Sequence, residues 1–463
     1  MPALKLHRTI DSDSVSNNYR ELNLSLCNCA IVILGASGDL ARRKLMPALN
    51  TLFERGEIDR SCVIVGSGRT FFTDVEFRNR FHSGSDFGSL IFYHQYTPGL
   101  RDFITSKGNF SRIIVFLSQP PLAYESSVKE LAADGFGKET VIALEKPFGY
   151  DYGSARKLNE TLLGCFGEEQ IYRIDHYLGK EVVQDVLVFR FANSLFYPLW
   201  NSRYIESIQI NALESEGVGE RGRYFDGAGI IRDMVQNHLL QLLCLLTMEA
   251  PVTLGADDIR EQKISVLRSM EIVSCNRFQY EGYRLEKGVS ADSSTETFAE
   301  VSLRINNFRW QGTPVYIRTG KAVHRKGTEI GVRFKAVPKV LYNRIGDLNE
   351  NTIIFKIQPN EGIVLDLSTK IPAADNVLTS AHMNLCYREA FCVPSPEAYQ
   401  KLIREILIGD RTLFVSALET ETAWQLVNGF PDKGALGFYP RGRLPISDFN
   451  VKWIDFDSYT GVC

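Results

Sequence analysis

The strongest constraint on the fold is a run of five apolar residues, Ala30 to Leu34, that leads directly into the turn Gly35 to Gly38. Uninterrupted apolar character is typical of a strand that is buried on both faces of a parallel sheet. Leucines then recur at helical spacing from Leu45 to Leu52, and a second apolar run occupies residues 62–65. This order of strand, turn, helix and strand predicts the start of a doubly wound α/β domain.

The same alternation continues further along the chain. Apolar strands are predicted at 112–117 and 141–144, and a helix is predicted between them at 124–133. Strands that alternate with helices are typical of a parallel sheet, whose ligands bind beyond the carboxyl ends of the strands. We therefore expect a Rossmann-like dinucleotide-binding domain over residues 27–175, preceded by a flexible N-terminal arm over 1–26.

The second half of the chain has a different pattern. Polar and apolar residues partly alternate there, which is typical of antiparallel strands with one covered face. Strands are predicted at 205–212, 299–305, 315–318 and 351–357, and helices at 230–247 and 396–408. The predicted fold class is an α/β Rossmann-type doubly wound N-terminal domain plus a larger α+β domain built on a mainly antiparallel sheet. This second domain, residues 176–463, is expected to serve substrate binding and oligomerisation.

The overall composition limits the classes of partner. The formal net charge of −3, with 44% hydrophobic and 23% charged residues, is ordinary for a globular protein and argues against nucleic-acid binding or a membrane-surface role. No apolar run approaches the roughly 18 residues of a membrane helix, and the N-terminal segment lacks the apolar core of a secretory signal. The nine cysteines include no CxxC pair, so we expect reduced thiols, no metal site and a cytoplasmic location.

The turn after the first strand is the candidate cofactor site. It keeps the first glycine of the GxGxxG fingerprint but has Ser37 in place of the second. Turn glycines after strands are common, so a purely structural turn is the alternative. The position between a strand and a helix favours a dinucleotide, because backbone N–H groups there can bind a pyrophosphate. The candidate cofactor-binding residues of this segment are Gly35, Ala36, Ser37, Gly38, Asp39 and Leu40.

The end of the second strand indicates which dinucleotide is bound. Proteins that bind NAD usually carry an acidic residue there, which accepts from the ribose 2′-hydroxyl. This chain has Arg69 instead, after Gly66, Ser67 and Gly68. An arginine can donate two hydrogen bonds to a 2′-phosphate, and Arg42 at the helix start could assist. A solvated surface arginine is the alternative, but the sequence favours NADP, with NAD as a weaker alternative.

The segment from Arg173 to Glu181 follows a predicted strand end at 170–172. If a helix begins near His176, then His176 and Lys180 stand at positions i and i+4 on one face. An imidazole beside an ammonium near a helix start could bind a phosphate. The alternative is a capped helix with a surface Lys–Glu pair, and spacing alone favours that alternative.

The nonapeptide RIDHYLGKE at 173–181 resembles the signature of glucose-6-phosphate dehydrogenases. Three further segments resemble the same family in the same order, namely GASGDLA at 35–41, EKPFG at 145–149 and IIRDMVQNH at 230–238. The resemblance implies oxidation of glucose 6-phosphate at C1 to 6-phosphogluconolactone, with hydride transfer to NADP. This reaction is the first step of the oxidative pentose phosphate pathway. The resemblance also implies a homodimer or homotetramer, with no nucleic-acid or membrane partner.

The resemblance further implies roles for single residues. His238, which on its apolar helix would otherwise be a core residue, becomes the catalytic base, and Asp175 becomes its partner. Asp233 is a poor partner, because it lies five residues earlier, roughly 140° around an ideal helix. The implied substrate-binding residues are Lys146, His176, Tyr177, Lys180, Glu214, Asp233, Lys321 and Lys326. The implied cofactor-binding residues, beyond the turn, are Arg42, Arg69, Glu145 and Lys146.

Two other functions remain open at this point. Another sugar oxidoreductase with the EKP motif would share the cofactor half but lack the pair His176 and Lys180. A non-catalytic NADPH sensor could keep the cofactor turn but would be free to lose Asp175 or His238. This chain has all four of these residues.

Overall fold

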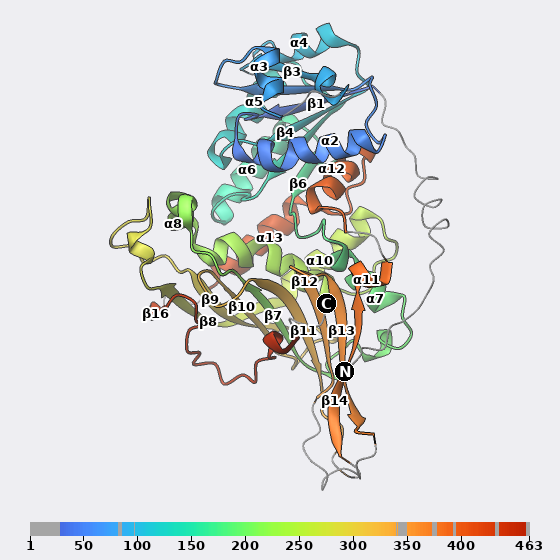
Figure 1. The fold of residues 1–463 in the computed structure, drawn as a ribbon, viewed down its shortest axis with the longest axis vertical. Coiled ribbons are helices and arrows are strands. Elements are labelled where there is room, and N and C mark those ends of the chain that lie inside the picture. The colour runs from blue at the N-terminus through green and yellow to red at the C-terminus, as the bar shows by residue number, and fades with distance from the viewer. Residues whose placement is uncertain are drawn as a thin grey trace.

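The computed structural model describes residues 28–81, 86–96, 98–338, 340, 350–372, 377–391, 395–430 and 435–459. The predicted arm at 1–26 lies outside these residues. Figure 1 shows two sheets, one in the upper and one in the lower part of the molecule, with helices between them. The predicted fold class, a Rossmann-type domain joined to a larger domain with a mainly antiparallel sheet, is confirmed.

The first sheet has seven strands in the order β15-β6-β5-β4-β1-β2-β3. Its strands are β1 (Cys29–Leu34), β2 (Val63–Gly68), β3 (Ile91–Gln95), β4 (Arg112–Leu117), β5 (Thr140–Glu145), β6 (Ile171–Ile174) and β15 (Phe414–Val415). Strands β1 to β6 are parallel to their neighbours, and β15 is antiparallel to β6. The helices of this half are η1 (Ala41–Leu45), α2 (Met46–Glu54), α3 (Asp74–Asn79), α4 (Leu100–Lys107), α5 (Tyr124–Ala133) and α6 (Tyr152–Cys165).

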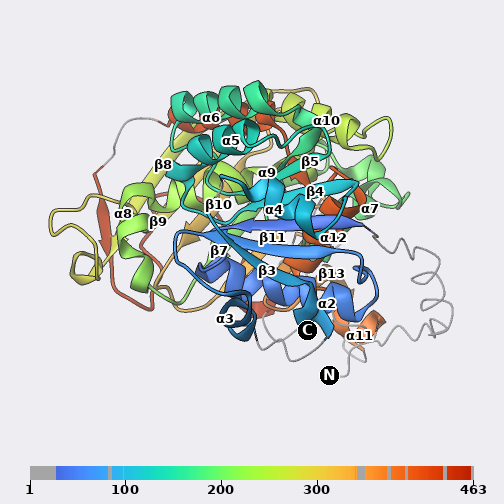
Figure 2. The ribbon, with the colours of Figure 1, turned by 90° about the horizontal axis from the view of Figure 1, so that it is seen from above.

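The two faces of β1 explain why its sequence is uninterruptedly apolar. Ile31 and Ile33 pack into one apolar cluster with residues of α2, whereas Val32 and Leu34 pack into a second cluster with residues of α5 and α6. Helices therefore cover both faces, and Figure 2 shows α5 and α6 on one side of the sheet and α2 on the other. A strand between two helical layers has no exposed face on which polar side chains would be favourable.

The second sheet has nine strands in the order β14-β13-β12-β11-β7-β10-β9-β8-β16. Its strands are β7 (Ile205–Leu213), β8 (Met270–Tyr280), β9 (Phe298–Ile305), β10 (Val315–Gly320), β11 (Gly327–Phe334), β12 (Thr352–Gln358), β13 (Gly362–Lys370), β14 (Leu378–Cys386) and β16 (Gly437–Tyr439). Only the pairs β7–β10 and β8–β16 are parallel. The helices are α7 (Glu181–Phe191), α8 (Gly222–Ile230), η7 (Ile231–Leu239), α9 (Leu240–Thr247), α10 (Ala256–Ser269), α11 (Tyr387–Phe391), α12 (Ala398–Ile408) and α13 (Ala417–Asn428).

Short 3-10 turns connect several of these elements. They are η2 (Asp86–Leu90), η3 (Pro121–Ala123), η4 (Glu168–Gln170), η5 (Tyr197–Leu199), η6 (Gly219–Arg221), η8 (Tyr283–Leu285) and η9 (Phe456–Tyr459). The largest apolar cluster joins α7, α9, α10 and α13 to one face of the second sheet. Near the C-terminus, Ile454 and Phe456 cover Ile354 and Val364 in a smaller cluster.

Two predicted helices differ from the structure. The helix expected to begin near His176 begins at Glu181, and residues 176–179 form turns. His176 and Lys180 are therefore not neighbours on a helix face. The helix expected at 230–247 is divided into the π-helical η7 and the α-helix α9, after a break at Gly229, where φ is 72°. The extra residue in each π-helical turn changes which side chains of η7 share a face.

The C-terminal part of the chain returns to the first sheet. Helix α12 packs on α2, and β15 extends the sheet beside β6. The fully buried Arg173 of β6 donates to the Asn159 side chain at 2.9 Å, to Glu168 at 2.8 Å and to the Val415 carbonyl at 3.5 Å. The chain therefore passes between the two halves more than once. The predicted domain boundary between residues 175 and 176 stays a prediction.

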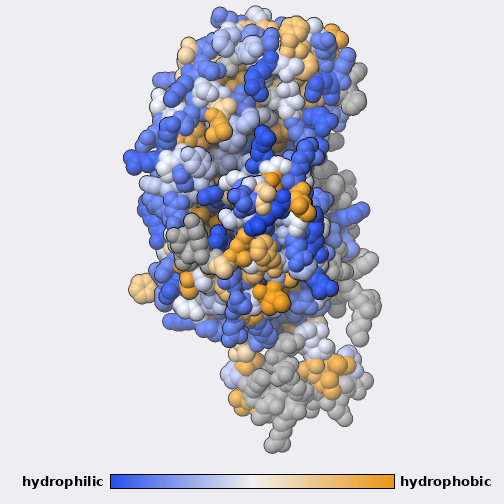
Figure 3. Space-filling model, turned by 90° about the vertical axis from the view of Figure 1, so that its left-hand side faces the viewer, coloured by the Kyte–Doolittle hydropathy of each residue, from blue (hydrophilic) through white to orange (hydrophobic). Residues whose placement is uncertain are grey.

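Two predictions made from the composition, reduced cysteines and the absence of a membrane helix, can be compared with the described residues. Cys386 is disulfide-bonded, so the prediction of reduced thiols is wrong at this position. Among the described residues, no helix is both long and apolar enough to cross a bilayer. The face in Figure 3 is mainly hydrophilic, with a group of apolar side chains around mid-height.

A buried ion pair between α10 and α13 yields a stability prediction. Lys263 Nζ lies 2.6 Å from Glu419 Oε1, and both side chains are almost completely buried. Glu419 Oε2 also accepts from the Ser416 amide at 2.8 Å. Replacing Lys263→Met leaves a buried carboxylate without its cation, which we expect to lower the free energy of unfolding by about 3–5 kcal/mol. Urea unfolding followed by tryptophan fluorescence measures this loss.

The control is the double variant Lys263→Met/Glu419→Gln. It removes both charges while the amide oxygen can still accept from Ser416, so most of the lost stability should return. A single variant as stable as the unmodified protein would contradict the argument.

Candidate active site

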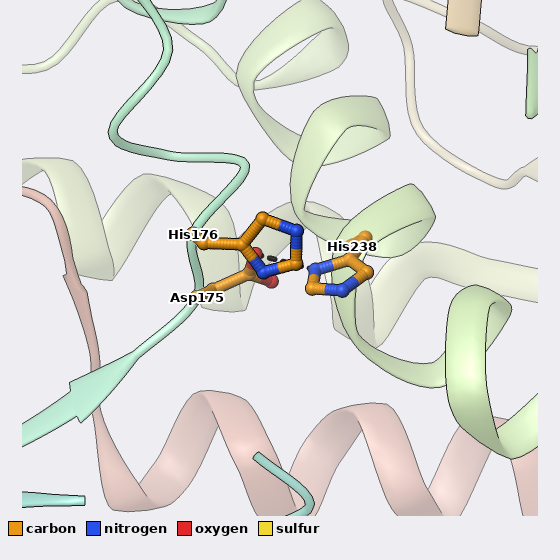
Figure 4. A group of neighbouring side chains, drawn as sticks. All are labelled: Asp175, His176 and His238. Carbon is orange, nitrogen blue, oxygen red and sulfur yellow. Dashed lines mark hydrogen bonds and ion pairs between the residues drawn. The ribbon is translucent and has the colours of Figure 1, made fainter. Parts of the chain in front are cut away.

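The centre of the site is a hydrogen bond between two residues that are 63 positions apart. His238 Nδ1 lies 2.5 Å from Asp175 Oδ1, and each side chain is only 1% exposed. Asp175 directly follows β6, and His238 is near the end of η7. Figure 4 shows the carboxylate and the imidazole directed at each other from these two elements. The second oxygen of Asp175, Oδ2, is buried without a donor among the described residues, whereas Oδ1 also accepts from the Tyr177 amide at 3.0 Å and so closes the turn.

The pKa values of Asp175 and His238 determine which of the two side chains is charged. Burial alone would raise the pKa of Asp175, but the charge and hydrogen bond of His238 outweigh it and hold the pKa at about 2. Burial lowers the pKa of His238 below its usual value of 6.5, although Asp175 opposes this shift. At neutral pH the pair is therefore a carboxylate beside a neutral imidazole, with the ring proton on Nδ1.

The other nitrogen of His238, Nε2, differs from Nδ1 in its surroundings. Nε2 is buried and makes no hydrogen bond to any residue that the structure describes. A buried nitrogen with a free lone pair is unfavourable unless a ligand donates to it. This atom is therefore the group that could accept a proton from a substrate.

Two rings hold the imidazole in place. The Tyr177 ring stacks on it at a centroid distance of 4.3 Å, and the His176 ring meets it edge-on at 4.5 Å. Figure 4 shows His176 beside both members of the pair. Burial and the neighbouring His238 lower the pKa of His176 well below its usual value, so this ring is also neutral at neutral pH.

Asp175, His176 and His238 each place one donor atom within 4.8 Å of the others, an arrangement that could hold a metal ion. However, Asp175 Oδ1 and His238 Nδ1 are only 2.5 Å apart. Two ligands of one tetrahedral zinc ion are separated by roughly 3.3 Å, given metal–ligand distances of about 2.0–2.1 Å. The geometry thus fits an acid–base pair better than a metal centre.

Two charged pairs lie next to this centre. Lys146 Nζ donates to Asp233 Oδ1 at 3.0 Å, and Lys321 Nζ donates to Glu214 Oε2 at 2.5 Å. Burial opposes the ionisation of Asp233, but Lys146, Lys321 and Arg221 outweigh it and lower the pKa of this carboxyl. Sugar hydroxyl groups need such alternating donors and acceptors.

Lys180 lies at the start of α7 and lines a cavity of about 1310 Å³ together with His176. Burial lowers the pKa of Lys180. Glu361 opposes that shift, while Lys44 and Lys326 add to it. Lys180 makes no ion pair within the described ranges, whereas Lys44 pairs with Glu397. Glu361, Glu389 and Glu397 also line the cavity, so Lys180 is the group there that is most suitable for an anion such as a phosphate.

The turn at the end of β1 lies directly against the backbone at the end of β4. Gly35 has a φ of 83°, and a Cβ atom there would lie 2.4 Å from the Ser118 carbonyl oxygen. The amides of Gly35, Ala36 and Gly38 are bonded within the protein. The amides that follow at the helix start are the groups left for a pyrophosphate. The residues present therefore fit a dinucleotide.

The two arginines predicted to bind the 2′-phosphate of NADP, Arg69 and Arg42, differ in their surroundings. Arg69 is exposed after β2 and forms no ion pair with a described carboxylate, so its guanidinium is available to a ligand. Arg42 instead pairs with Asp39 at 3.2 Å. A 2′-phosphate would have to compete with Asp39 for Arg42 but not for Arg69.

Several side chains at the site were not predicted from the sequence. They are Lys44, Arg221, Gln358, Glu361 and Tyr399. Gln358 donates to the Tyr177 hydroxyl at 3.4 Å, and Tyr399 arrives from α12. No periodicity marks these positions, because they approach the site only through the tertiary packing of distant elements.

Two family models match nearly the whole chain. The model described as "Glucose-6-phosphate dehydrogenase, NAD binding domain" matches residues 32–185, and the one described as "Glucose-6-phosphate dehydrogenase, C-terminal domain" matches residues 187–442. The chain belongs to the glucose-6-phosphate dehydrogenase family. The family predicted from the four motifs is thus confirmed.

Individual relatives agree with this family. Glucose-6-phosphate 1-dehydrogenase of Bacillus subtilis (strain 168) is 37% identical over 452 residues, which cover 88% of this chain and 91% of that protein. A solved structure of a glucose-6-phosphate dehydrogenase in complex with its substrate glucose-6-phosphate has a TM-score of 0.84 at 33% identity, covering 90% of this chain and 96% of that chain. The glucose-6-phosphate 1-dehydrogenase from Mycobacterium avium has a TM-score of 0.82, also at 33% identity, covering 90% and 95%.

The hydrogen bond between Asp175 and His238 leads to a prediction of pH dependence. We expect Asp175→Asn to lower kcat by at least about 10²-fold, because it no longer orients the base or stabilises its protonated form. Asp175 raises the pKa of His238, so its loss should move the acidic limb of kcat/KM to lower pH. A pH profile of the initial rate measures both effects.

Asp151→Asn is a matched control, since Asp151 caps α6 by accepting from the Ser154 amide, and asparagine can do the same. An Asp175→Asn protein with the same acidic limb as the unmodified protein would contradict the assigned pair.

Proposed function

We propose that the protein oxidises glucose 6-phosphate at C1 to 6-phosphogluconolactone with hydride transfer to NADP, the first step of the oxidative pentose phosphate pathway. The observation that carries this proposal is the Nε2 atom of His238, which has no partner among the described residues, on an imidazole that burial keeps neutral and Asp175 orients. Membership of the family and the fit of the first domain to a dinucleotide support it.

The reaction needs a base for one proton. When the C1 hydroxyl donates to His238 Nε2, the proton moves to this nitrogen while the hydride leaves C1, and the C1–O bond becomes a carbonyl. A nicotinamide held by the first domain would supply the acceptor for this hydride. The positive charge that develops on His238 lies beside the ionised Asp175, which stabilises it without itself accepting the proton.

The substrate-binding roles follow from the charges around this base. We propose that four side chains bind sugar hydroxyl groups, namely Asp233, Glu214, Lys146 and Lys321. They offer acceptors and donors next to the hydrogen-bonded pair of Asp175 and His238. His176, Tyr177, Lys180 and Lys326 are proposed for the phosphate. Lys180 and His176 line the same cavity, and Lys326 is close enough to lower the pKa of Lys180.

We propose NADP as the preferred cofactor, with NAD as a weaker alternative. The exposed Arg69 after β2 supports this preference, because a carboxylate at that position would repel a 2′-phosphate. The turn 35–40, Arg42, Glu145 and Lys146 complete the proposed cofactor site.

The remaining assignments concern the whole molecule. We propose that residues 27–175 bind the dinucleotide and that residues 176–463 bind the sugar and mediate assembly into a homodimer or homotetramer. A cytoplasmic location is proposed, without a nucleic-acid or membrane partner and without a catalytic metal.

A direct assay tests the proposed reaction. Absorbance at 340 nm, recorded with glucose 6-phosphate or glucose and with NADP or NAD, should show the highest kcat/KM for the pair glucose 6-phosphate and NADP. His238→Asn should lower kcat at least about 10²-fold with substrate affinity little changed. Equal turnover of glucose and glucose 6-phosphate, or normal turnover by the variant, would refute the proposal.

The phosphate site is tested separately with Lys180→Ala. One charge-assisted hydrogen bond contributes roughly 1.5–3 kcal/mol, so KM for glucose 6-phosphate should rise about 10- to 150-fold. The kcat/KM for glucose should hardly change, because glucose has no phosphate. Lys157→Ala is the control, since the Lys157 ammonium lies on the surface of α6 and pairs with Glu125. A parallel loss for both sugars would exclude Lys180 from the phosphate site.

A further inference from the structure

The C-terminal segment, residues 435–459, contacts a loop that carries two of the proposed substrate lysines. The segment runs from β16 to η9, and Figure 1 shows it in red. Its part beyond residue 442 lies outside the family model that matches this half of the chain. The loop, residues 321–326, connects β10 with β11 and includes Lys321 and Lys326. The contacts between the segment and the loop are separate from the apolar cluster that covers the sheet.

The backbone of the loop is fixed by hydrogen bonds from the C-terminal segment. The hydroxyl group of the buried Tyr439 donates to the Lys321 carbonyl at 2.6 Å, and the Gly442 amide donates to the Ala322 carbonyl at 2.7 Å. Ala322 has a φ of 54°, in the left-handed region that residues other than glycine seldom adopt. Such a conformation persists only where neighbouring groups fix it. The segment therefore helps to hold the bend of the loop.

The side chain of Asp457 fixes the other end of the loop. His324 Nε2 lies 2.8 Å from Asp457 Oδ2, and the Arg325 guanidinium pairs with Asp457 Oδ1. Arg325 also donates to both carboxylate oxygens of Glu329 on β11, at 2.6 Å and 3.2 Å. One carboxylate of η9 thus contacts the two residues that directly precede Lys326.

We propose that Asp457 and Tyr439 are positioning residues, which hold the loop 321–326 so that Lys321 and Lys326 reach the substrate. The inference rests on the proposed function for the roles of these two lysines. A lysine ammonium lies at the end of a flexible four-carbon stem. A fixed backbone limits the positions that the ammonium can take, and so lowers the entropy that is lost when a ligand binds.

The first test compares two variants that each remove one negative charge from the segment. In Asp457→Asn the contacts with His324 and Arg325 are weakened. Both contacts are partly exposed to solvent, so we expect KM for glucose 6-phosphate to rise about 3- to 10-fold with kcat near normal, and the overall stability to change little. Asp457→Glu keeps the carboxylate and should restore most of the affinity.

Asp455→Asn is the matched control for this charge change. Asp455 pairs with no residue of the loop in the part of the chain that the structure describes. Its Oδ1 atom accepts from the Asp457 amide at 3.2 Å, and the amide oxygen of asparagine can accept in the same way. This variant should therefore have the KM of the unmodified protein.

The second test observes the loop without an activity assay. The amides of residues 321–323 donate to backbone carbonyl groups. Hydrogen exchange of the full-length protein, followed by mass spectrometry, should show these amides exchanging at least about 3-fold faster in Tyr439→Phe and in Asp457→Asn. Tyr459→Phe is the control, because it removes a hydroxyl group of the same segment that donates to Asp366 on β13 at 2.8 Å. Its loop should exchange at the unmodified rate.

Two results would overturn the inference. One is loop exchange at the unmodified rate in both Tyr439→Phe and Asp457→Asn. The other is a KM that stays constant in Asp457→Asn or rises equally in Asp455→Asn, because the segment would then only cover the sheet. If Tyr439→Phe fails to fold, the variants of Asp457 and Asp455 still decide. Failure of the proposed function would appear differently, as an unmodified protein that does not oxidise glucose 6-phosphate, and hydrogen exchange would still test how the loop is held.

Discussion

The site depends on one buried hydrogen bond, between the carboxylate of Asp175 and the imidazole of His238. A charged carboxylate with 1% exposure is unfavourable unless donors reach it, and here both donors reach Oδ1 while Oδ2 has none among the described residues. Asp175 receives the Tyr177 amide and the His238 ring, and this requirement brings the end of β6 against η7. The two halves of the molecule therefore meet at the hydrogen bond between Asp175 and His238. The same pair is the one to which the proton transfer is assigned.

Around this bond, charge is arranged in pairs that a ligand can complete. Lys146 with Asp233 and Lys321 with Glu214 are nearly neutral units that offer hydrogen bonds to hydroxyl groups without attracting free ions. Lys180, in contrast, has no carboxylate partner among the described residues, and Lys44 and Lys326 contribute further positive charge. The cavity at the start of α7 is lined by Lys180 and His176, and the His176 ring meets the ring of the base edge-on.

The return of the C-terminal segment connects this cavity with the cofactor half. Helix α12 packs against α2 and places the Tyr399 ring nearly parallel to the His176 ring at a centroid distance of 6.4 Å, while β15 pairs with β6 just before Asp175. The buried Arg173 of the same strand joins the β15 backbone to α6 through Asn159. The segment that carries the signature is therefore held by α6 and by the C-terminal elements α12 and β15.

Local sequence patterns were sufficient for the architecture. The apolar run of β1 predicted a strand buried on both sides, and the structure has apolar clusters on both of its faces. Most predicted strands lie within a few residues of the observed ones. The prediction was wrong where tertiary contacts override local preference. The helix near His176 begins only at Glu181, because Asp175 binds the Tyr177 amide and holds the intervening residues in turns.

The sequence by itself determined the fold class, the cofactor turn and, through its four motifs, the family, because these depend on residues that are close together along the chain. The tertiary structure decided which side chains converge. It placed Asp175 within 2.5 Å of His238, left Nε2 without a partner among the described residues and brought Lys44, Glu361 and Tyr399 to the cavity. The physical reason is that distance and burial between remote segments, and the pKa values that follow from them, arise only when the two sheets pack against their shared helices.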